Sequence, residues 1–499
     1  MTTHLLPFAT NRRRVLFVSA EIFPLAKTGG MADVCGALPA ALGREGDLDI
    51  LLMMPGYDSV FAAMGELREL AQLKDLPGGD ARLLVGLIPG TDQPLVLLDQ
   101  PDLFRRPGSL YVDEEGREWP DNAVRFASLC HAAAALAAGR ALPYWHADLV
   151  HCHDWHTGLI PLLLAAEPRR PSTVLTIHNL AFQGLFPAPL FDELRLPSGS
   201  FSVEGCEFFG QISFLKAGIN FADKLTTVSP SYAEEITTSE FGMGLEGLLA
   251  RRRSDLIGIL NGIDEVLWNP ATDRMLADAY SADDLSGKSQ CKTALQHEWG
   301  LAPDPDAPLF VFAARLEDQK MADTLLAVMP DLLERPGTQI AILGRGNRSI
   351  EEGFAGWPAR APGRVAARIG YAEEWARQLF AGGDMLIHGS RFEPCGLTPL
   401  YALRYGAVPI VRSVGGLKDT VVGVRESTLA DGMATGFSFA DATGVAMLDA
   451  IDAALALFRQ PDHWSRLMQS GMRRDFSWRR SVGLYRRLYD ELTLSRQAA

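Results

Sequence analysis

Short apolar runs alternate with amphipathic segments along most of the chain, and this alternation limits the possible folds more than any other feature. Runs such as "RVLFVSA", "LDILLMM", "STVLTIH" and "LFVFAA" have the length of buried strands, and helix-like segments fall between them. Strands that helices bury on both faces are typical of parallel sheets. We therefore predict an α/β chain built from doubly wound, Rossmann-like sheets.

The chain is long enough for more than one domain, because 499 residues exceed what a single core usually reaches. The alternation lapses around residues 262–308, which are rich in Pro, Asp and Gly, and then resumes. We interpret this stretch as a linker. Two doubly wound domains are expected, one over residues 1–262 and one over residues 263–475.

Composition excludes several classes of partner. The 47 basic and 61 acidic residues give a formal net charge of −14, which argues against binding of nucleic acid. No apolar run approaches the roughly 20 residues that a membrane span needs, and the arginines of "MTTHLLPFATNRRRVLF" come after the apolar patch, the wrong order for a signal peptide. Six scattered cysteines without a C-x-x-C pair favour reduced thiols and a cytoplasmic protein.

Polar residues follow the predicted strands, where open α/β sheets bind their ligands. Two such domains facing each other would line a cleft with both sets of loops. The residues at these strand ends are Lys27, His178, Asn179, Asn261, Arg315, the glycines of 344–346 and Glu393.

The stretch "PLAKTGGMADV" places Lys27 just before Gly29 and Gly30. It matches neither a P-loop nor a dinucleotide fingerprint. Two interpretations stay open: an ordinary strand-to-helix turn in which glycine supplies positive φ, and an anion site at a helix N-terminus.

The segment "HCHDWH", residues 151–156, invites a metal-site interpretation, but its spacing fits no zinc motif and no matching downstream cluster is obvious. We expect no metal. Asp154 belongs either to a polar strand terminus that bonds its own loop or to the rim of a sugar-binding cleft. His178, in "TIHNLAFQG", has both a structural and a functional interpretation.

Two segments of the second half suit a diphosphate. "AARLEDQK" places Arg315 and Lys320 around a loop, where charge-assisted contacts reach about 1.5–3 kcal/mol each; solvated surface charge is the alternative. "SRFEPCGLTPLYALRYG" offers Glu393 and then a helix, with Pro394 expected in its first turn. Free N–H groups from Cys395 to Thr398 would face an anion. "LGRGN" lacks the third glycine of a dinucleotide site, so NAD is not expected.

Taken together, these motifs resemble a known family. "KTGGMADVCGALPAAL", "HCHDWHTG", "LTIHNLAFQG", "GILNGIDEVLWNP" and "RFEPCGLTPLYALRYG" occur in the order and spacing of the bacterial glycogen synthases, which are related to plant starch synthases. The resemblance runs from about residue 14 to about residue 490.

The resemblance implies a glycosyltransferase-B fold with a C-terminal helix, residues 476–499, that crosses back to the first domain. It implies retaining transfer of glucose from ADP-glucose to the non-reducing end of an α-1,4-glucan, without a metal or resident cofactor; the partners are then ADP-glucose, ADP and glycogen or a malto-oligosaccharide. The resemblance places Lys27 and Gly30 near the donor diphosphate and sugar, and Arg315 and Lys320 on the phosphates. It places Asp154 and His178 near the glucose, and Glu393 on glucose hydroxyls. The backbone amides of Cys395, Gly396, Leu397 and Thr398 would face the donor, and Tyr111 would lie beside the adenine. We expect His178, Arg315, Lys320 and Glu393 to be catalytic, and Gly29, Asn179 and Asn261 to be further substrate-binding residues.

The sequence departs from the family pattern at three places. His388-Gly389 replaces a more usual apolar-Pro pair, Met321 stands where glycine is frequent, and Pro399 stands where glutamine is common. The second glutamate of the E-x7-E pattern of related glycosyltransferases is Tyr401 here, so we assign no two-carboxylate mechanism. UDP-glucose as donor and a catalytically silent glucan-binding protein remain alternatives.

Overall fold

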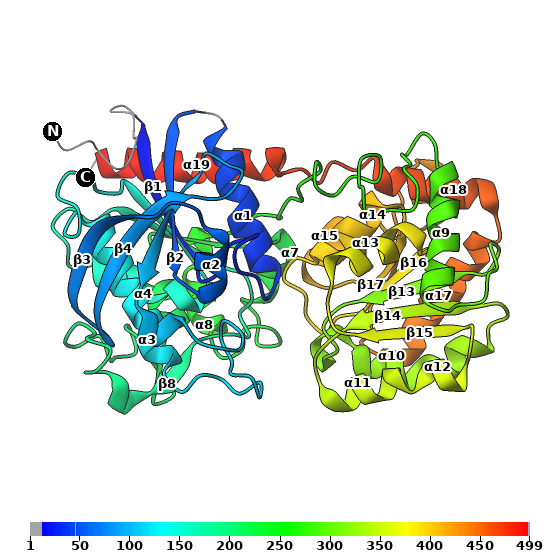
Figure 1. The fold of residues 1–499 in the computed structure, drawn as a ribbon, viewed down its shortest axis with the longest axis horizontal. Helices are drawn as coiled ribbons and strands as arrows, with labels where there is room; N and C mark the ends of the chain where they lie inside the picture. The colour runs from blue at the N-terminus through cyan, green and yellow to red at the C-terminus, as the bar shows by residue number, and fades with distance from the viewer. Residues whose placement is uncertain (1–11, 45, 498–499) are drawn as a thin grey trace. The chain divides into compact units, whose positions relative to one another are not determined.

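The computed structural model describes residues 12–44 and 46–497, which divide into two compact α/β units (Figure 1). Unit 1 holds the described residues up to Val228, Ala233–Gly262 and the helix that begins at Trp478; unit 2 holds Ser229–Tyr232 and Ile263–Ser477. The predicted fold class is confirmed. The prediction that the N-terminus is not a signal peptide concerns residues that lie largely outside the described ones.

Unit 1 contains a sheet of order β12-β11-β7-β6-β1-β2-β5-β4-β3. Its strands are β1 (Arg13–Val18), β2 (Leu48–Pro55), β3 (Arg68–Leu76), β4 (Gly79–Leu87), β5 (Pro94–Asp99), β6 (Leu149–His153), β7 (Ser172–Ile177), β11 (Lys224–Thr227) and β12 (Leu256–Gly258). The strands from β12 to β5 pair in parallel, whereas β3 and β4 form an antiparallel hairpin at the edge. A small separate sheet has the order β8-β10-β9, from Leu185–Pro187, Gln211–Ser213 and Glu207–Phe208.

The helices of unit 1 include the last helix of the chain. They are α1 (Gly30–Gly43), α2 (Asp58–Ala63), α3 (Pro101–Phe104), α4 (Asn122–Ala137), α5 (Leu159–Leu164), α6 (Phe214–Phe221), α8 (Glu246–Arg251) and α19 (Trp478–Gln497), while α7 (Pro230–Glu235) spans a unit boundary; the short 3-10 turns are η1 (Trp155–Thr157), η2 (Ala188–Leu190) and η3 (Arg253–Asp255). The red helix α19 lies beside the blue helix α1 (Figure 1). Its Tyr489 hydroxyl bonds Nδ1 of His151 at 2.7 Å, which anchors α19 to β6.

Unit 2 contains a parallel sheet of order β15-β14-β13-β16-β17-β18. The strands are β13 (Leu309–Ala313), β14 (Gln339–Gly344), β15 (Val365–Ile369), β16 (Met385–His388), β17 (Val408–Arg412) and β18 (Phe437–Phe439). Alternate side chains enter different cores: Phe310 and Phe312 pack into one cluster, and Leu309 and Val311 into the other. Because successive side chains of a strand point to opposite faces and both faces are buried, each strand appears in the sequence as a continuous apolar run.

Helices cover both faces of the unit 2 sheet (Figure 1). One core takes side chains from α10 (Ala322–Glu334), α11 (Arg348–Ala355), α17 (Gly444–Phe458) and α18 (Pro461–Met472), and the other from α9 (Ser286–Glu298), α13 (Glu373–Gly382) and α14 (Leu397–Arg404). The remaining elements are η4 (Asp318–Lys320), α12 (Trp357–Arg360), α15 (Gly415–Thr420) and α16 (Glu426–Ala430).

The linker predicted around residues 262–308 is wrong for its central part. Helix α9 lies within it and buries Cys291 and Leu295 in the core of unit 2. The Pro, Asp and Gly residues on either side of α9 hid this helix, since its mean composition is polar. Among the described helices, none is both long and apolar enough to cross a bilayer.

Candidate active site

The strand order of unit 2 defines where a ligand would bind. Strands β14 and β15 lie on one side of β13, and β17 and β18 lie on the far side of β16. The strand order therefore reverses between β13 and β16, which is the topological switch point of the sheet. Open α/β sheets bind ligands at such a point, beyond the carboxyl ends of the strands. Arg315 and Lys320 follow β13, and Glu393 follows β16, so the predicted residues of unit 2 flank its switch point.

Glu393 is the centre of a buried polar cluster, with a relative exposure of only 5%. Its Oε2 atom accepts hydrogen bonds from Lys320 Nζ, from His388 Nε2 at 3.1 Å and from Ser390 Oγ at 2.9 Å. Burial opposes ionisation, but the charge of Lys320 and the bond from His388 outweigh it and hold the pKa of Glu393 well below its usual range. Glu393 is therefore a carboxylate at neutral pH.

Helix α14 presents open backbone donors next to this carboxylate. Its N-cap is Gly396, with φ of 83° in the left-handed region, and its first residue is Leu397. Within the described part of the chain, the N–H groups of Gly396, Leu397 and Thr398 donate no hydrogen bond. Such donors, backed by the helix dipole, bind anions.

The start of α14 differs from the prediction in two respects. Pro394 lies before the N-cap rather than in the first turn, and the proline of the first turn is Pro399. Because Pro399 is the third helical residue, the N–H that it lacks would have had no partner within the helix. Cys395 is buried against Gly416, whose Cβ, if present, would come within 2.2 Å of the Cys395 carbonyl oxygen.

Arg315 is paired locally. Its guanidinium bonds Glu317 Oε2 at 2.6 Å and Gln319 Oε1 at 2.7 Å, and 41% of its side chain is exposed. A phosphate would have to compete with Glu317 for this cation.

Tyr371 is a residue that the sequence analysis missed. It follows β15 and Gly370, and its side chain is 64% exposed at the same carboxyl edge of the sheet. An exposed aromatic ring in that place offers a stacking surface. The available signal was the dipeptide "GY" directly after a predicted strand.

Unit 1 also gathers its predicted residues at a switch point, which lies between β1 and β6. Lys27 follows β1, Asp154 follows β6 and His178 follows β7. Lys27 Nζ bonds Asp33 Oδ1 at 2.8 Å, and its side chain is 23% exposed.

The glycine loop beside Lys27 does not need positive φ. Gly29 has φ of −153° and is the N-cap of α1, and Gly30 is the first helical residue. The N–H groups of Thr28 and Gly29 instead donate to the buried carboxylate of Glu21. The interpretation as a turn with left-handed glycine is therefore wrong. The anion site stays a prediction, and two of the N–H groups that it would use are bonded to Glu21. A Cβ at Gly29 would meet no atom within 4 Å.

Asp154 joins the strand ends of β6 and β7. Its Oδ1 accepts the N–H of His178 at 2.6 Å and the N–H of Asn179 at 3.3 Å, and its backbone φ is 55°. Burial raises the pKa of Asp154 to about 7, although these hydrogen bonds oppose the shift. Burial lowers the pKa of His178 to about 3, so its imidazole is neutral. The structure thus brings Asp154, His178 and Asn179 together.

Two further predicted residues of unit 1 have defined surroundings. The Tyr111 hydroxyl donates to Glu21 Oε1 at 2.9 Å, and its ring stacks on His156 with centroids 4.7 Å apart. Asn261 is buried, and its Oδ1 has no hydrogen-bond partner among the described residues. A buried oxygen of this kind can accept a hydrogen bond from a ligand hydroxyl.

One cluster could hold a metal ion within the described ranges: Cys35, His153 and His178, whose ligand atoms lie within 4.8 Å of one another. Nδ1 of His153 and Nε2 of His178 already share a hydrogen bond of 2.9 Å. Burial raises the pKa of the Cys35 thiol well above its usual value, so the thiol keeps its proton. Nε2 of His153 is buried without a hydrogen-bond partner among the described residues. The absence of a metal stays a prediction.

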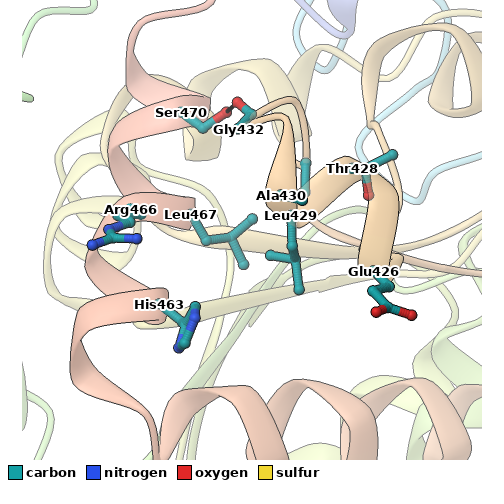
Figure 2. A pocket seen from close by; sticks show the side chains of 10 residues that line it. Glu426, Thr428, Leu429, Ala430, Gly432, His463, Arg466, Leu467 and Ser470 are labelled. Atoms are coloured by element: carbon teal, nitrogen blue, oxygen red, sulfur yellow. Dashed lines mark hydrogen bonds between the residues drawn. The ribbon is translucent and has the colours of Figure 1, made fainter.

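A separate pocket of about 350 Å³ lies between α16 and α18 of unit 2 (Figure 2). His463 and Arg466 project from α18, and Leu429 and Leu467 point toward each other (Figure 2). None of the predicted site residues lines it.

Comparisons with known proteins show the family of the chain. Residues 14–251 match the starch synthase catalytic domain family, and residues 307–456 match the family of glycosyl transferases group 1. A glycogen synthase of Burkholderia thailandensis is 51% identical over 486 residues, which cover 97% of this chain and 91% of that protein. A glycogen synthase of Paramagnetospirillum magneticum is 48% identical, covering 96% of this chain and 98% of that protein.

Solved structures show the same relationship. The catalytic domain of starch synthase IV from Arabidopsis thaliana, bound to ADP and acarbose, is similar with a TM-score of 0.87 and 30% identity, over 97% of this chain and 99% of that one. A sucrose-phosphate synthase from Thermosynechococcus elongatus, 16% identical with a TM-score of 0.58, shares the fold alone. Because relatives about half identical to this chain cover almost its whole length, the resemblance drawn from the motifs is confirmed and the chain belongs to the glycogen synthase family.

Proposed function

We propose that this chain transfers glucose from ADP-glucose to the non-reducing end of an α-1,4-glucan, glycogen or a malto-oligosaccharide, with retained configuration and release of ADP. One observation carries the proposal: an ionised carboxylate, a lysine and an open helix N-terminus flank the switch point of the unit 2 sheet. The related starch synthase bound to ADP and acarbose supports a nucleotide and a glucan as ligands.

The donor diphosphate is assigned to the cations and backbone donors of unit 2. The N–H groups of Gly396, Leu397 and Thr398 meet the phosphates, with Arg315 and Lys320 beside them. As the bond to glucose breaks, negative charge grows on the departing ADP, and fixed donors stabilise that charge without reorganising. The acceptor hydroxyl attacks from the face that the phosphate leaves, and the phosphate takes its proton.

Glu393 binds the sugar rather than acting as an acid. Its carboxylate is ionised, and its Oε1 accepts no hydrogen bond from the described residues, so it can accept one from a glucose hydroxyl. The position of a second carboxylate is filled by Tyr401, whose ring stacks on Trp268 with centroids 3.9 Å apart. Retention through a carboxylate pair, as in glycosidases, is therefore not the mechanism that we propose.

The predicted residues of unit 1 would meet hydroxyl groups and the donor. We assign Asp154, His178, Asn179 and Asn261 to sugar hydroxyls, because each is buried or half-buried at a strand end. Lys27 and the start of α1 at Gly30 are assigned to the donor phosphates or glucose. Tyr371, and Tyr111 less directly, are the aromatic candidates for the adenine.

No resident metal or cofactor has a role in this proposal, since cationic side chains and backbone N–H groups of the chain would bind the diphosphate. A reducing, cytoplasmic location fits the six cysteines, all of which are buried free thiols.

The test is ADP release by the purified chain with glycogen, using ADP-glucose and UDP-glucose side by side, and with Glu393→Gln as a variant. We expect ADP-glucose to be used, and Glu393→Gln to lose on the order of 10²-fold in rate while it keeps its circular dichroism spectrum. Preferred use of UDP-glucose would establish the second donor, and no nucleotide release from either donor would favour a silent glucan-binding protein.

A further inference from the structure

We propose that His388 is a positioning residue: its Nε2–H fixes one oxygen of Glu393 so that the other oxygen stays available to the glucose of the donor. The inference rests on the proposed role of Glu393 in binding that sugar. It concerns a residue that departs from the pattern of the family, in which an apolar side chain is usual at this place.

The geometry shows which oxygen is held. Three donors from two segments converge on Oε2 of Glu393: Lys320 from η4, and His388 and Ser390 from the end of β16 and its loop. The other oxygen, Oε1, receives no hydrogen bond from the described residues. Three donors on one oxygen restrict rotation of the carboxylate, and a restricted group loses less entropy when it binds a hydroxyl.

The protonation state of His388 follows from its neighbours. The ring is 2% exposed, and burial lowers its pKa even though Glu393 opposes the shift. A neutral imidazole carries one proton, and an ionised Glu393 can only accept. The proton therefore lies on Nε2, and Nδ1 is left as a buried acceptor without a partner among the described residues.

An unpartnered buried nitrogen destabilises a fold, because it has lost water and gained nothing in return. An apolar residue at position 388 would remove this penalty. A histidine that is unfavourable for folding but bonded to the carboxylate of the site is best explained by function, since functional sites are where local rules of stability are broken.

The test compares His388→Leu with wild type in three measurements. We expect urea unfolding to show equal or greater stability, the affinity for ADP to stay within about twofold, and kcat/KM for ADP-glucose to fall about tenfold or more. ADP lacks the glucose that Glu393 binds, so the loss should be confined to the sugar nucleotide. His388→Gln, whose amide can donate from a similar place, should recover most of the loss.

Two controls separate the explanations. His131, whose ring bonds the Leu194 carbonyl at 3.0 Å in unit 1, is a partly buried histidine outside the site. His131→Leu should lower stability to urea and leave kcat/KM unchanged, which is the opposite of the result expected for His388→Leu. Glu393→Gln tests the proposed role of the carboxylate itself.

The inference is overturned if Glu393→Gln is inactive while His388→Leu matches wild type in kcat/KM, or if His388→Leu loses ADP and ADP-glucose affinity equally. If Glu393→Gln keeps full activity, the role proposed for Glu393 fails first and the inference fails with it. If wild type releases no nucleotide, calorimetric Kd values for ADP-glucose and ADP replace kcat/KM, and a ratio unchanged in His388→Leu overturns the inference.

Discussion

Met321 and Gly389 should behave as a coupled pair. Met321 is fully buried and has φ of 53° and ψ of 30°, a left-handed conformation that costs a residue with a Cβ roughly 1–2 kcal/mol. A Cβ added at Gly389 would lie 3.1 Å from Met321 Sδ and from Met447 Cε, and 3.2 Å from Met321 Cβ. The side chain at 321 therefore fills the space that a side chain at 389 would need.

The expected free energies follow from these contacts. Met321→Gly deletes a buried side chain, which costs about 2–5 kcal/mol, and relieves the backbone strain of roughly 1–2 kcal/mol, so the net loss is roughly 0–4 kcal/mol. Gly389→Ala overpacks the same space at about 1–3 kcal/mol. In the double variant the new methyl group occupies part of the vacated volume, and the loss should be about 1–2 kcal/mol smaller than the sum of the single losses.

Urea unfolding of the four proteins, followed by circular dichroism, measures this coupling. If the two single losses in unfolding free energy add within about 0.5 kcal/mol in the double variant, the side chains at 321 and 389 do not compete for the same space. A coupling of the predicted sign would explain why two departures from the family pattern occur together, since Met321 where glycine is frequent requires Gly389 where proline is usual.

Three further outcomes are expected. Lys27→Gln should lower kcat/KM for ADP-glucose on the order of 10²-fold, with partial recovery in Lys27→Arg; an equal loss in Asp33→Asn would show instead that Lys27 acts only through its ion pair. Activity should stay within about twofold in EDTA, and rescue of a lost activity by one divalent ion would contradict this. The pKa of Asp154 is raised from 3.8 to about 7, so its contribution to stability is present below pH 4 and is lost as the pH rises through 7. Asp154→Asn should flatten that part of the stability profile, measured by urea unfolding from pH 4 to pH 8.

The strands of both sheets were predictable wherever helices bury them on two faces. The runs at β1, β7 and β13 are continuous and apolar, so length and composition identified them. The hairpin β3–β4 was missed because β3, "RELAQLKDL", is an exposed edge strand with few apolar residues. Helix α9 was missed because only one narrow face of it is buried.

The site was predictable to the level of strand ends and no further. Parallel strands end at one edge, which is why Lys320 and Glu393 could be placed near each other before any contact was known. Their partners are set by tertiary packing. No local pattern indicates that His388 donates to Glu393, or that Ser390 shares the same oxygen.

The glycine loop at Lys27 shows how a local pattern can be right about chemistry and wrong about the partner. The pattern indicated backbone donors that face an anion, and the N–H groups of Thr28 and Gly29 do face an acidic side chain, but it is the chain's own Glu21. Burial raises the pKa of Glu21, and four donors from Thr28, Gly29 and Tyr111 oppose that shift. These hydrogen bonds hold the loop in its conformation without a bound sugar nucleotide. A ligand at this loop would therefore meet Lys27, which is bonded to Asp33, and the first turn of α1, which follows the two N–H groups held by Glu21.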